Sequence, residues 1–241
     1  MSYRPHLQSG ADNEEGRALR VELREAIRTR RSVRRFLDKP VAKAIIREII
    51  DDAVWSPSWG NTQPWECVVA SGSVLEEFKK RNKEAIVTGQ VPNPEISMPM
   101  KWPAAHKKRY QEIGRDLFAT LSIARDDKEA RFQYYVEMCG LFDAPAFVLV
   151  TVDTNLSVEY ALHDVGMFVQ TFCLLAHDRG LGTCIMAAAV QYPDILRDLL
   201  SVPDTQRIVV SIAVGWPDRD AVVNTFARTR KDMDGCVRWV E

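Results

Sequence analysis

The chain has 241 residues, of which 46% are hydrophobic and 27% are charged, a composition typical of globular proteins and unlike that of disordered or collagen-like chains. The 32 Lys and Arg residues balance 33 Asp and Glu residues. The sequence therefore lacks the overall positive field that accompanies nonspecific binding to nucleic acids or membrane surfaces, and any function that depends on charge must be local.

Residues 1–16 form a polar arm that lacks the apolar segment of a secretory signal. The longest uncharged stretches, such as residues 165–176, are shorter than the roughly 20 residues that a membrane span requires. The 5 cysteines and 4 histidines are scattered without metal-ligand or thiol-redox spacing, which predicts reduced thiols and no metal site. We therefore expect a soluble cytoplasmic protein with no membrane partner.

Apolar residues at helical spacing predict a first helix around residues 19–27 and a second over residues 45–54. Later stretches predict strands at residues 65–70, 146–152 and 207–214. Others predict helices at residues 107–121, 127–141 and 159–178. The last two predicted strands are continuous runs of apolar and β-branched residues, as in central strands, and strands so far apart along the chain need helical connections.

No repeat and no long linker divides the chain, so residues 17–241 are expected to form a single domain. Residues 80–140 are more charged and are punctuated by Met and Pro, which indicates an inserted helical lid. The helix at residues 159–178 is apolar around most of its circumference and is expected to lie in the core. The C-terminal motif CVRWV, at residues 236–240, is typical of an edge strand or of a strand exchanged with a partner.

Basic residues concentrate between Arg28 and Arg47, where 8 of them accompany the single acid Asp38. Cations at the C-terminal end of a helix complement its dipole, so a solvated helix end accounts for part of this pattern. Arginine also matches the oxygens of a phosphate, and Ser32 adds a hydroxyl donor, which favours a phosphate site. A nucleic-acid patch is less favoured because no aromatic residues are interleaved with the basic ones.

The loop at residues 56–65, SPSWGNTQPW, is either a rigid turn between a helix and a strand or part of a binding surface. A turn explains its prolines and its glycine. It does not explain the polar and indole side chains that share the loop, which are Ser58, Asn61, Gln63, Trp59 and Trp65. Such a surface can hydrogen-bond a flat polar ring and pack against it. One ligand with a phosphate at one end and a flat ring at the other would link this loop to the basic cluster.

The segment RGLGTCIMAAAV, at residues 179–190, has glycines that suit a helix C-cap followed by tight packing, or a backbone that lies close to a ligand. A GWPD motif at residues 215–218 follows the last predicted strand, and a second basic group follows it at Arg228, Arg230 and Lys231. There is no Walker A loop, no GxGxxG after a strand and no GxSxG elbow.

Taken in order, RTRRSVRRF, SPSWGNTQPW, GLGTCIM, AVGWPD and the late arginine pair resemble the FMN-dependent nitroreductase family over nearly the whole chain. The insert, with KWPAAHKKRYQEIGRDLFATLSIARDDKEAR and LFDAPAF, is similar to the branch that includes nitrobenzoate reductases. The resemblance implies an α+β fold with a mixed central sheet flanked by helices. It further implies a homodimer that exchanges C-terminal strands and holds FMN at the subunit interface, under a lid formed by residues 80–140.

The resemblance also implies which residues contact FMN. The phosphate, the ribityl chain and the pyrimidine edge would be held by Arg30, Arg31, Ser32, Arg34, Arg228 and Arg230. The other subunit would contribute Pro57, Ser58 and Trp59, with Asn61 and Gln63 nearby. Met186, Ala187 and Ala188 would face the reactive flavin nitrogen. Many relatives have Glu and Gly at the last two of these positions, so this chain lacks a side chain that the family uses toward the nicotinamide.

As implied by the resemblance, NADPH or NADH reduces the flavin, leaves, and is replaced by a small electron-poor aromatic substrate, so no catalytic side chain is required. Substrate selection would involve the insert, where the available groups are Trp102, His106, Arg109, Tyr110, Arg115, Phe118 and Arg125. The same fold also hosts reductive dehalogenases and other FMN oxidoreductases. Alternatives of another class are a flavin- or nucleotide-binding module without turnover and a nucleic-acid binder that uses residues 28–47.

Overall fold

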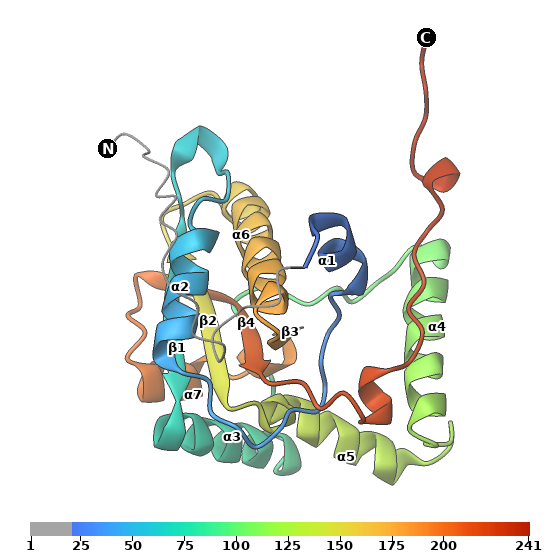
Figure 1. Cartoon of the computed structure of the whole chain (residues 1–241). Coiled ribbons are helices and arrows are strands. Elements are labelled where there is room, and N and C mark those ends of the chain that lie inside the picture. Colours follow the sequence, from blue (N-terminus) through green and yellow to red (C-terminus); the bar gives the residue numbers. More distant parts are fainter. Residues whose placement is uncertain (1–20) are drawn as a thin grey trace, which may run out of the picture.

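The computed structural model describes residues 21–241, so the polar arm expected at residues 1–16 lies outside the described part of the chain (Figure 1). Its centre is a 4-stranded sheet with the order β1-β2-β4-β3. The strands are β1 (Trp65–Ser71), β2 (Ala146–Asp153), β3 (Gly182–Met186) and β4 (Gln206–Gly215). All neighbouring pairs of these strands are antiparallel. Parallel pairing, which a mixed sheet would require, is limited among the described residues to an isolated bridge between Ser32 and Thr183.

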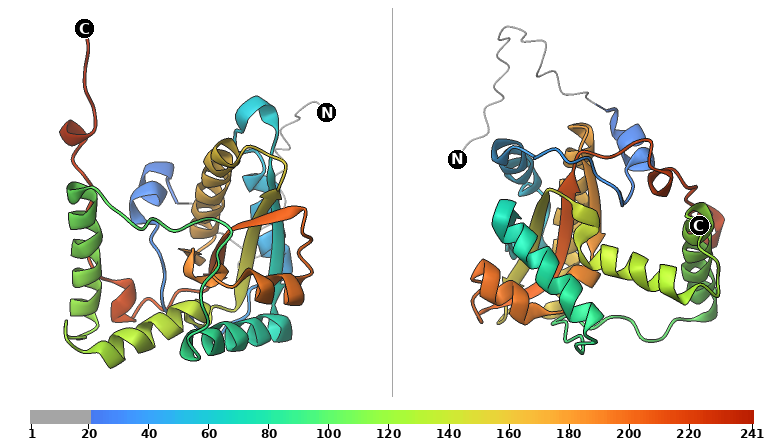
Figure 2. Two further views of the ribbon diagram at one scale, coloured as in Figure 1. Left: turned by 180° about the vertical axis from the view of Figure 1, so that it is seen from behind. Right: turned by 90° about the horizontal axis from the view of Figure 1, so that it is seen from below.

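Helices cover both faces of this sheet (Figure 2). One face packs against α2 (Lys43–Ala53) and α6 (Val158–Asp178). The opposite face packs against α3 (Gly72–Val87), α5 (Lys128–Cys139) and α7 (Pro193–Leu200). The structure therefore has a helix–sheet–helix arrangement, as expected for an α+β fold.

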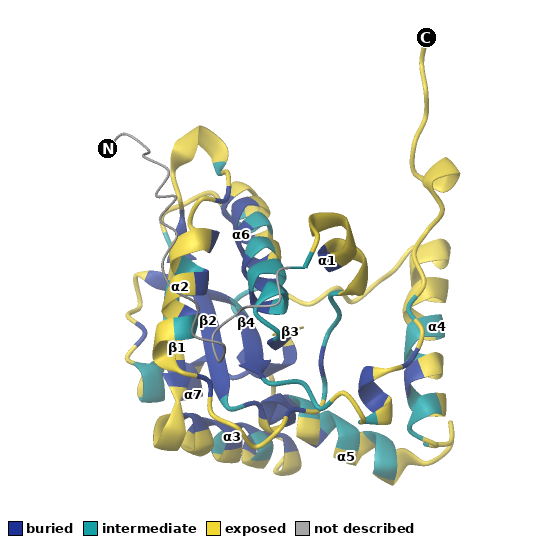
Figure 3. Ribbon diagram, in the orientation of Figure 1, coloured by how far each residue is buried: buried dark blue, intermediate teal, exposed yellow. Residues whose placement is uncertain are grey.

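Strand β2 shows why its sequence is apolar without interruption. Val148 and Val150 pack into the cluster beneath α2 and α6, whereas Phe147 and Leu149 pack into the cluster on the opposite face. Successive side chains of a strand point to opposite faces, so a strand covered on both sides must be apolar at every position. Figure 3 shows the resulting buried centre of the sheet.

The predicted strands and the helices at residues 45–54 and 159–178 are confirmed within a few residues. The first helix, α1 (Leu23–Thr29), begins two residues inside the described part of the chain and ends two residues beyond the predicted range. Elements that the sequence did not predict are α3, β3 and α7. Helix α3 was missed because its buried face includes Lys79 and Asn82, polar residues that break the apolar pattern.

The predicted lid contains two kinds of structure. Helix α3 and helix α5 pack into the core, with Phe78 and Cys139 fully buried. Helix α4 (Ala104–Thr120) stands away from the sheet and is largely exposed (Figures 1 and 3). It is attached at its C-terminal end, where Leu117 packs against Val223 and Phe226. The role of residues 80–140 as a lid therefore stays a prediction. Helix α4 is the part of this range that lies farthest from the sheet.

The C-terminal residues 236–241 are exposed, form no strand within this chain and project past α4 (Figure 1).

Among residues 21–241, no helix combines the length and the apolar character needed to span a bilayer. The cysteines are free thiols, and burial raises the pKa of Cys173 to about 11. That thiol therefore stays protonated at neutral pH, as expected of an unreactive core cysteine.

Candidate functional site

The basic segment from Arg30 to Arg34 lies along the exposed edge of β3. Ser32 forms a parallel bridge with Thr183, and the backbone N–H of Val33 donates to the Thr183 carbonyl at 2.9 Å. A Cβ on Gly182 would lie 2.6 Å from the Val33 side chain. Glycine is therefore required there to let the two backbones approach, which explains one of the glycines of the GLG motif by packing.

The C-terminal part of the chain holds this segment from its other side. Asn224 Oδ1 accepts the backbone N–H of Arg34 at 2.7 Å, and its Nδ2 donates to the Arg35 carbonyl at 2.8 Å. Arg31 Nη2 donates to the Phe226 carbonyl at 2.6 Å. Arg228 donates to the carbonyl of Arg30 and, at 2.8 Å, to that of Arg28. The predicted early and late basic groups are therefore brought together.

The Phe226 ring lies beneath the arginines of the segment. The guanidinium carbons of Arg31 and Arg34 are 5.2 and 5.6 Å from its centroid. A cation above an aromatic face is stabilised by the ring quadrupole without losing its charge. The ring therefore supports both guanidinium groups and leaves their charge available to a ligand.

The charges of this cluster are not paired with carboxylates of the described residues. Among residues 21–241, Arg30, Arg31, Arg34 and Arg228 form no ion pair. The Nε atoms of Arg30 and Arg31 are buried and have no hydrogen-bond partner in this part of the chain. Burial, aided by the charge of Arg34, lowers the pKa of Arg31. A buried donor without a partner is costly, so the arrangement suits an anion that would complete these hydrogen bonds.

A cavity of about 190 Å³ opens beside Arg30 and Arg31, with His177, Arg219 and Asn224 also on its wall. His177 Nε2 lies 2.8 Å from the Thr29 hydroxyl. Burial, then the charges of Arg219, Arg30 and Arg228, lower the pKa of His177, despite the opposing effect of Asp178. Arg30, Arg31 and Arg219 outnumber the carboxylate on the cavity wall, Asp218, so the cavity carries net positive charge.

Sequence reasoning missed His177, Asn224 and Phe226 because no local motif marks them. Each reaches the site through long-range packing, and the Arg34–Asn224 contact spans 190 positions.

A second cavity, of about 490 Å³, is lined by Arg34, Arg35, Tyr134, Glu137 and Val222, among others. No group of 3 or more metal-ligating side chains gathers within the described residues.

The loop at residues 56–65 is rigid, and its polar groups largely bond one another. The Trp59 backbone N–H donates to the buried Asp164 carboxylate at 3.1 Å. Ser58 Oγ accepts the backbone N–H of Gln63 at 2.9 Å, and the Gln63 amide donates to Asn61 at 3.2 Å. These hydrogen bonds are consistent with the turn interpretation, and the contact of these side chains with FMN stays a prediction.

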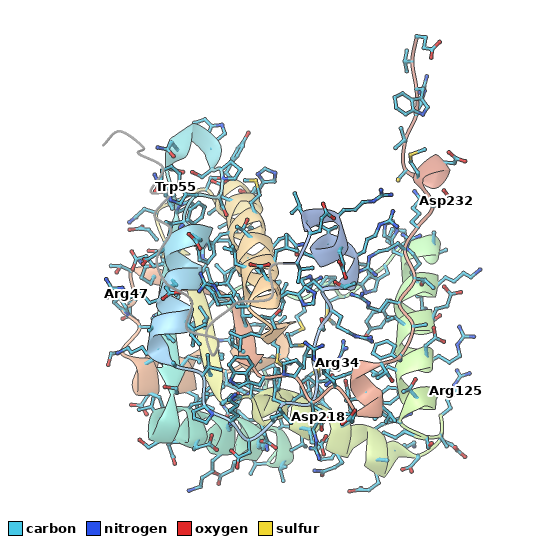
Figure 4. The ribbon with its side chains drawn as sticks, in the orientation of Figure 1. Arg34, Arg47, Trp55, Arg125, Asp218 and Asp232 are labelled. Atoms are coloured by element: carbon cyan, nitrogen blue, oxygen red, sulfur yellow. The ribbon has the colours of Figure 1, made fainter. Side chains whose placement is uncertain are left out.

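This loop lies apart from the arginine cluster within one chain. Figure 4 shows Trp55, just before the loop, and Arg34 in separate parts of the molecule. Trp55 and Trp59 are 78% and 65% exposed, and the Trp59 ring packs against Tyr160 at 5.6 Å between centroids.

The GLGTCIMAA segment ends α6 and forms β3. Gly180 has φ of +76° and its N–H donates to the His177 carbonyl at 3.0 Å, as in a glycine C-cap. At the other end of the strand, Met186 and Ala188 are buried and Ala187 is exposed. Its edge position places this segment next to the arginines, because Ser32 and Arg34 both lie close to Cys184.

The decisive comparison concerns residues 27–216, which match the Nitroreductase family. The chain belongs to the nitroreductase family. It is 30% identical to a 4-nitrobenzoate reductase of Pseudomonas putida, over 87% of this chain and 91% of that protein. It is 32% identical to a chloronitrobenzene nitroreductase of Comamonas testosteroni, over 87% of this chain and 93% of that protein.

Solved nitroreductases share the fold of this family member. The FMN and NADPH-dependent nitroreductase NfnB from Sphigopyxis sp. strain HMH matches with a TM-score of 0.87 and 29% identity, over 92% of this chain and 100% of that chain. A more distant relative is the iodotyrosine deiodinase of Nematostella vectensis, at 25% identity over 95% of this chain and 79% of that protein.

In this nitroreductase-family chain, the predicted substrate residues of the insert divide into two groups. Trp102 stacks on Tyr110 with a centroid distance of 6.2 Å, at the exposed end of α4, and Arg115 is exposed on the same helix. Phe118 packs edge-on against Tyr134 at 5.4 Å, close to the arginine cluster. The exposed Arg230 Nη1 donates only to the neighbouring Thr229 carbonyl among the described residues.

Proposed function

We propose that this chain is an FMN-dependent NAD(P)H oxidoreductase that reduces nitroaromatic or similar electron-poor aromatic compounds. The observation that carries the proposal is the cluster of Arg30, Arg31, Arg34 and Arg228, whose charges no carboxylate of the described residues compensates. Family membership supports it, because relatives with 30% and 32% identity are named 4-nitrobenzoate reductase and chloronitrobenzene nitroreductase.

The residues of the cluster fit FMN. The buried Nε atoms of Arg30 and Arg31 lack partners, and phosphate oxygens are acceptors that match a guanidinium. Ser32 and Arg228 would complete the phosphate side. Bound FMN would supply the two-electron hydride chemistry that no side chain of the protein can perform.

Arg34 would lie toward the pyrimidine edge of the cofactor. A cation at that edge stabilises negative charge that develops there on reduction, and the effect is larger where water is excluded. Met186, Ala187 and Ala188 would line the neighbouring side from the end of β3. The roles left to the protein are binding, orientation and exclusion of water, and none of them needs a general acid or base.

The functional unit would be a homodimer. The exposed indole of Trp59 supports this part of the proposal, as does an exposed C-terminal segment with Trp239 at 76% exposure. Pro57, Ser58 and Trp59 of the partner subunit would cover the flavin bound to the arginine cluster. The C-terminal residues 236–240 would be exchanged between subunits.

A second candidate reaction is reductive dehalogenation on the same cofactor. The similarity to an iodotyrosine deiodinase favours it, although at lower identity than the similarity to the nitroreductases. The two reactions share the flavin and differ in the substrate that the insert admits.

The test begins with the visible spectrum of the purified protein, which should show bound flavin. NADPH or NADH should bleach that absorbance under anaerobic conditions, and 4-nitrobenzoate or chloronitrobenzene should restore it. Faster recovery with an iodinated phenol than with any nitroarene would favour the dehalogenase. A bound flavin that neither nicotinamide reduces would indicate a binding module, and a protein that cannot be loaded with FMN would contradict the proposal.

A further inference from the structure

Tyr134, on α5, lies where the base of the insert meets the arginine cluster. Its ring packs against Phe118 at 5.4 Å and against Phe142 at 5.6 Å, measured between centroids. It also packs against the small apolar cluster that contains Phe226, the ring beneath Arg34. Tyr134 and Arg34 line the same cavity of about 490 Å³.

The guanidinium of Arg34 is held by few groups. Its Nη1 donates to the Ser32 carbonyl at 3.3 Å, a long hydrogen bond, and Phe226 supports it from below at 5.6 Å. Within the described residues no carboxylate pairs with it. Tyr134 lines the same cavity, and its hydroxyl is close enough to Arg34 for the arginine to act on the pKa of the phenol, so Tyr134 is placed to restrain the direction of this side chain.

We propose that Tyr134 is a positioning residue that holds the Arg34 guanidinium toward the pyrimidine edge of FMN without neutralising its charge, and so helps to set the reduction potential of the flavin. The inference rests on the proposed function and deepens it. A phenol suits this role better than a carboxylate, because a carboxylate would hold the arginine equally well and cancel the charge that stabilises the reduced cofactor.

The ionisation of Tyr134 agrees with this role. Burial raises the pKa of Tyr134 to about 12, even though the charge of Arg34 and its hydrogen bond act in the opposite direction. The hydroxyl therefore stays protonated and neutral at physiological pH. Arg34 keeps its full positive charge while its position is fixed.

The chain offers a matched pair of substitutions on α5. Tyr134→Phe removes the hydroxyl and keeps the ring that packs against Phe118 and Phe142. Tyr135→Phe is the control, because the Tyr135 hydroxyl donates to Gln191 Oε1 at 2.9 Å instead. The measurements are the midpoint potential of bound FMN and the dissociation constants for oxidised and reduced FMN, on the full-length protein.

Tyr134→Phe should lower the midpoint potential, because affinity for reduced FMN falls more than affinity for oxidised FMN. The ratio of the two affinities should change by about three- to tenfold, as expected for one lost hydrogen bond. Tyr135→Phe should leave that ratio unchanged. Thermal unfolding of both variants verifies that each is folded.

Two results would overturn the inference while the proposed function stands. One is a Tyr134→Phe protein that binds FMN with an unchanged potential. The other is an equal shift in both variants, which would indicate a general response of α5. A wild-type protein that binds no FMN would instead refute the proposed function, and this inference with it.

Discussion

Two arginine sites of this molecule use the same side chain in opposite ways. Arg197, on α7, donates to Glu95 Oε1 at 2.6 Å and to the Pro203 and Gln206 carbonyls at 2.7 and 2.8 Å. Glu95 in turn accepts the backbone N–H of Ile208 at 2.7 Å. At the arginine cluster, Arg30 and Arg31 have buried Nε atoms with no partner.

The difference separates a structural arginine from a binding one. At Arg197 the protein supplies every partner, so the charge fastens α7 and the extended chain around Glu95 to β4. At the cluster, residues 21–241 supply backbone carbonyls and an aromatic ring but no counter-charge. Such an arrangement is unfavourable by itself, and it is retained where a ligand completes it.

The substitution Arg197→Ala should have the largest effect, and it tests whether Arg197 is structural and the arginine cluster is not. It leaves the half-buried Glu95 carboxylate without its partner, so we expect a loss of about 2 to 3 kcal/mol in unfolding free energy. Urea denaturation measures this loss. FMN affinity of the folded fraction should be unchanged, and a selective loss of FMN binding would break the contrast.

The reverse pattern is expected for Arg30→Ala. Removal of a charged donor to phosphate should weaken FMN binding about 10- to 100-fold, whereas stability of the flavin-free protein should be unchanged or higher. Fluorescence titration of the apoprotein with FMN measures the affinity. If this variant instead unfolds like Arg197→Ala, the cluster is a structural one.

The cluster should also give the flavin-free protein a pH dependence through His177. Because the pKa of His177 is lowered in the folded state, the unfolded chain takes up this proton first as the pH falls. The contribution of His177 to stability is full above its ordinary pKa of about 6.5 and is lost as the pH falls toward the lower folded value.

Thermal unfolding between about pH 7.5 and pH 5 measures that contribution. His177→Gln should flatten the profile in this range relative to the wild type. Binding of FMN should reduce the pH dependence of stability, because its phosphate group offsets the charges of the arginines. A profile that His177→Gln does not alter would argue against the crowding of positive charge described here.

The smallest expected effect requires no flavin. Inorganic phosphate at about ten times its dissociation constant should raise the melting temperature of the apoprotein by about 2 to 4 °C. Chloride at matched ionic strength should not do so, and Arg30→Ala should lose the response while Arg197→Ala keeps it. An equal response to both salts would mean that only general screening is involved.

The sequence predicted the arginine side of the site because RTRRSVRRF concentrates its charge within one short segment. It also predicted the central strands, since β2 is apolar on both faces. It could not predict Asn224 or Phe226. Asn224 bonds Arg34 across 190 positions and Phe226 bonds Arg31 across 195, and periodic patterns predict only local structure. For the same reason, Tyr134 could not be distinguished from Tyr135.

In the loop at residues 56–65, the polar composition alone could not separate a turn from a binding surface. Ser58 and Asn61 are hydrogen-bonded to Gln63, and Gly60 and Asn61 have positive φ. Local hydrogen bonds of this kind are a common use of Ser and Asn in turns. The contact of this loop with a cofactor therefore stays a prediction.

The contacts of Asn224, Phe226 and Arg228 with the basic segment can form only late in synthesis, because these three residues lie near the C-terminal end of the chain. The sheet and its helices are complete at Gly215, yet the Arg31 guanidinium and the backbone N–H of Arg34 bond Phe226 and Asn224, which follow it. A growing chain can therefore bury its core before it can bind an anion at Arg30–Arg34. The positive charge is assembled last, when the hydrophobic centre that supports it has already formed.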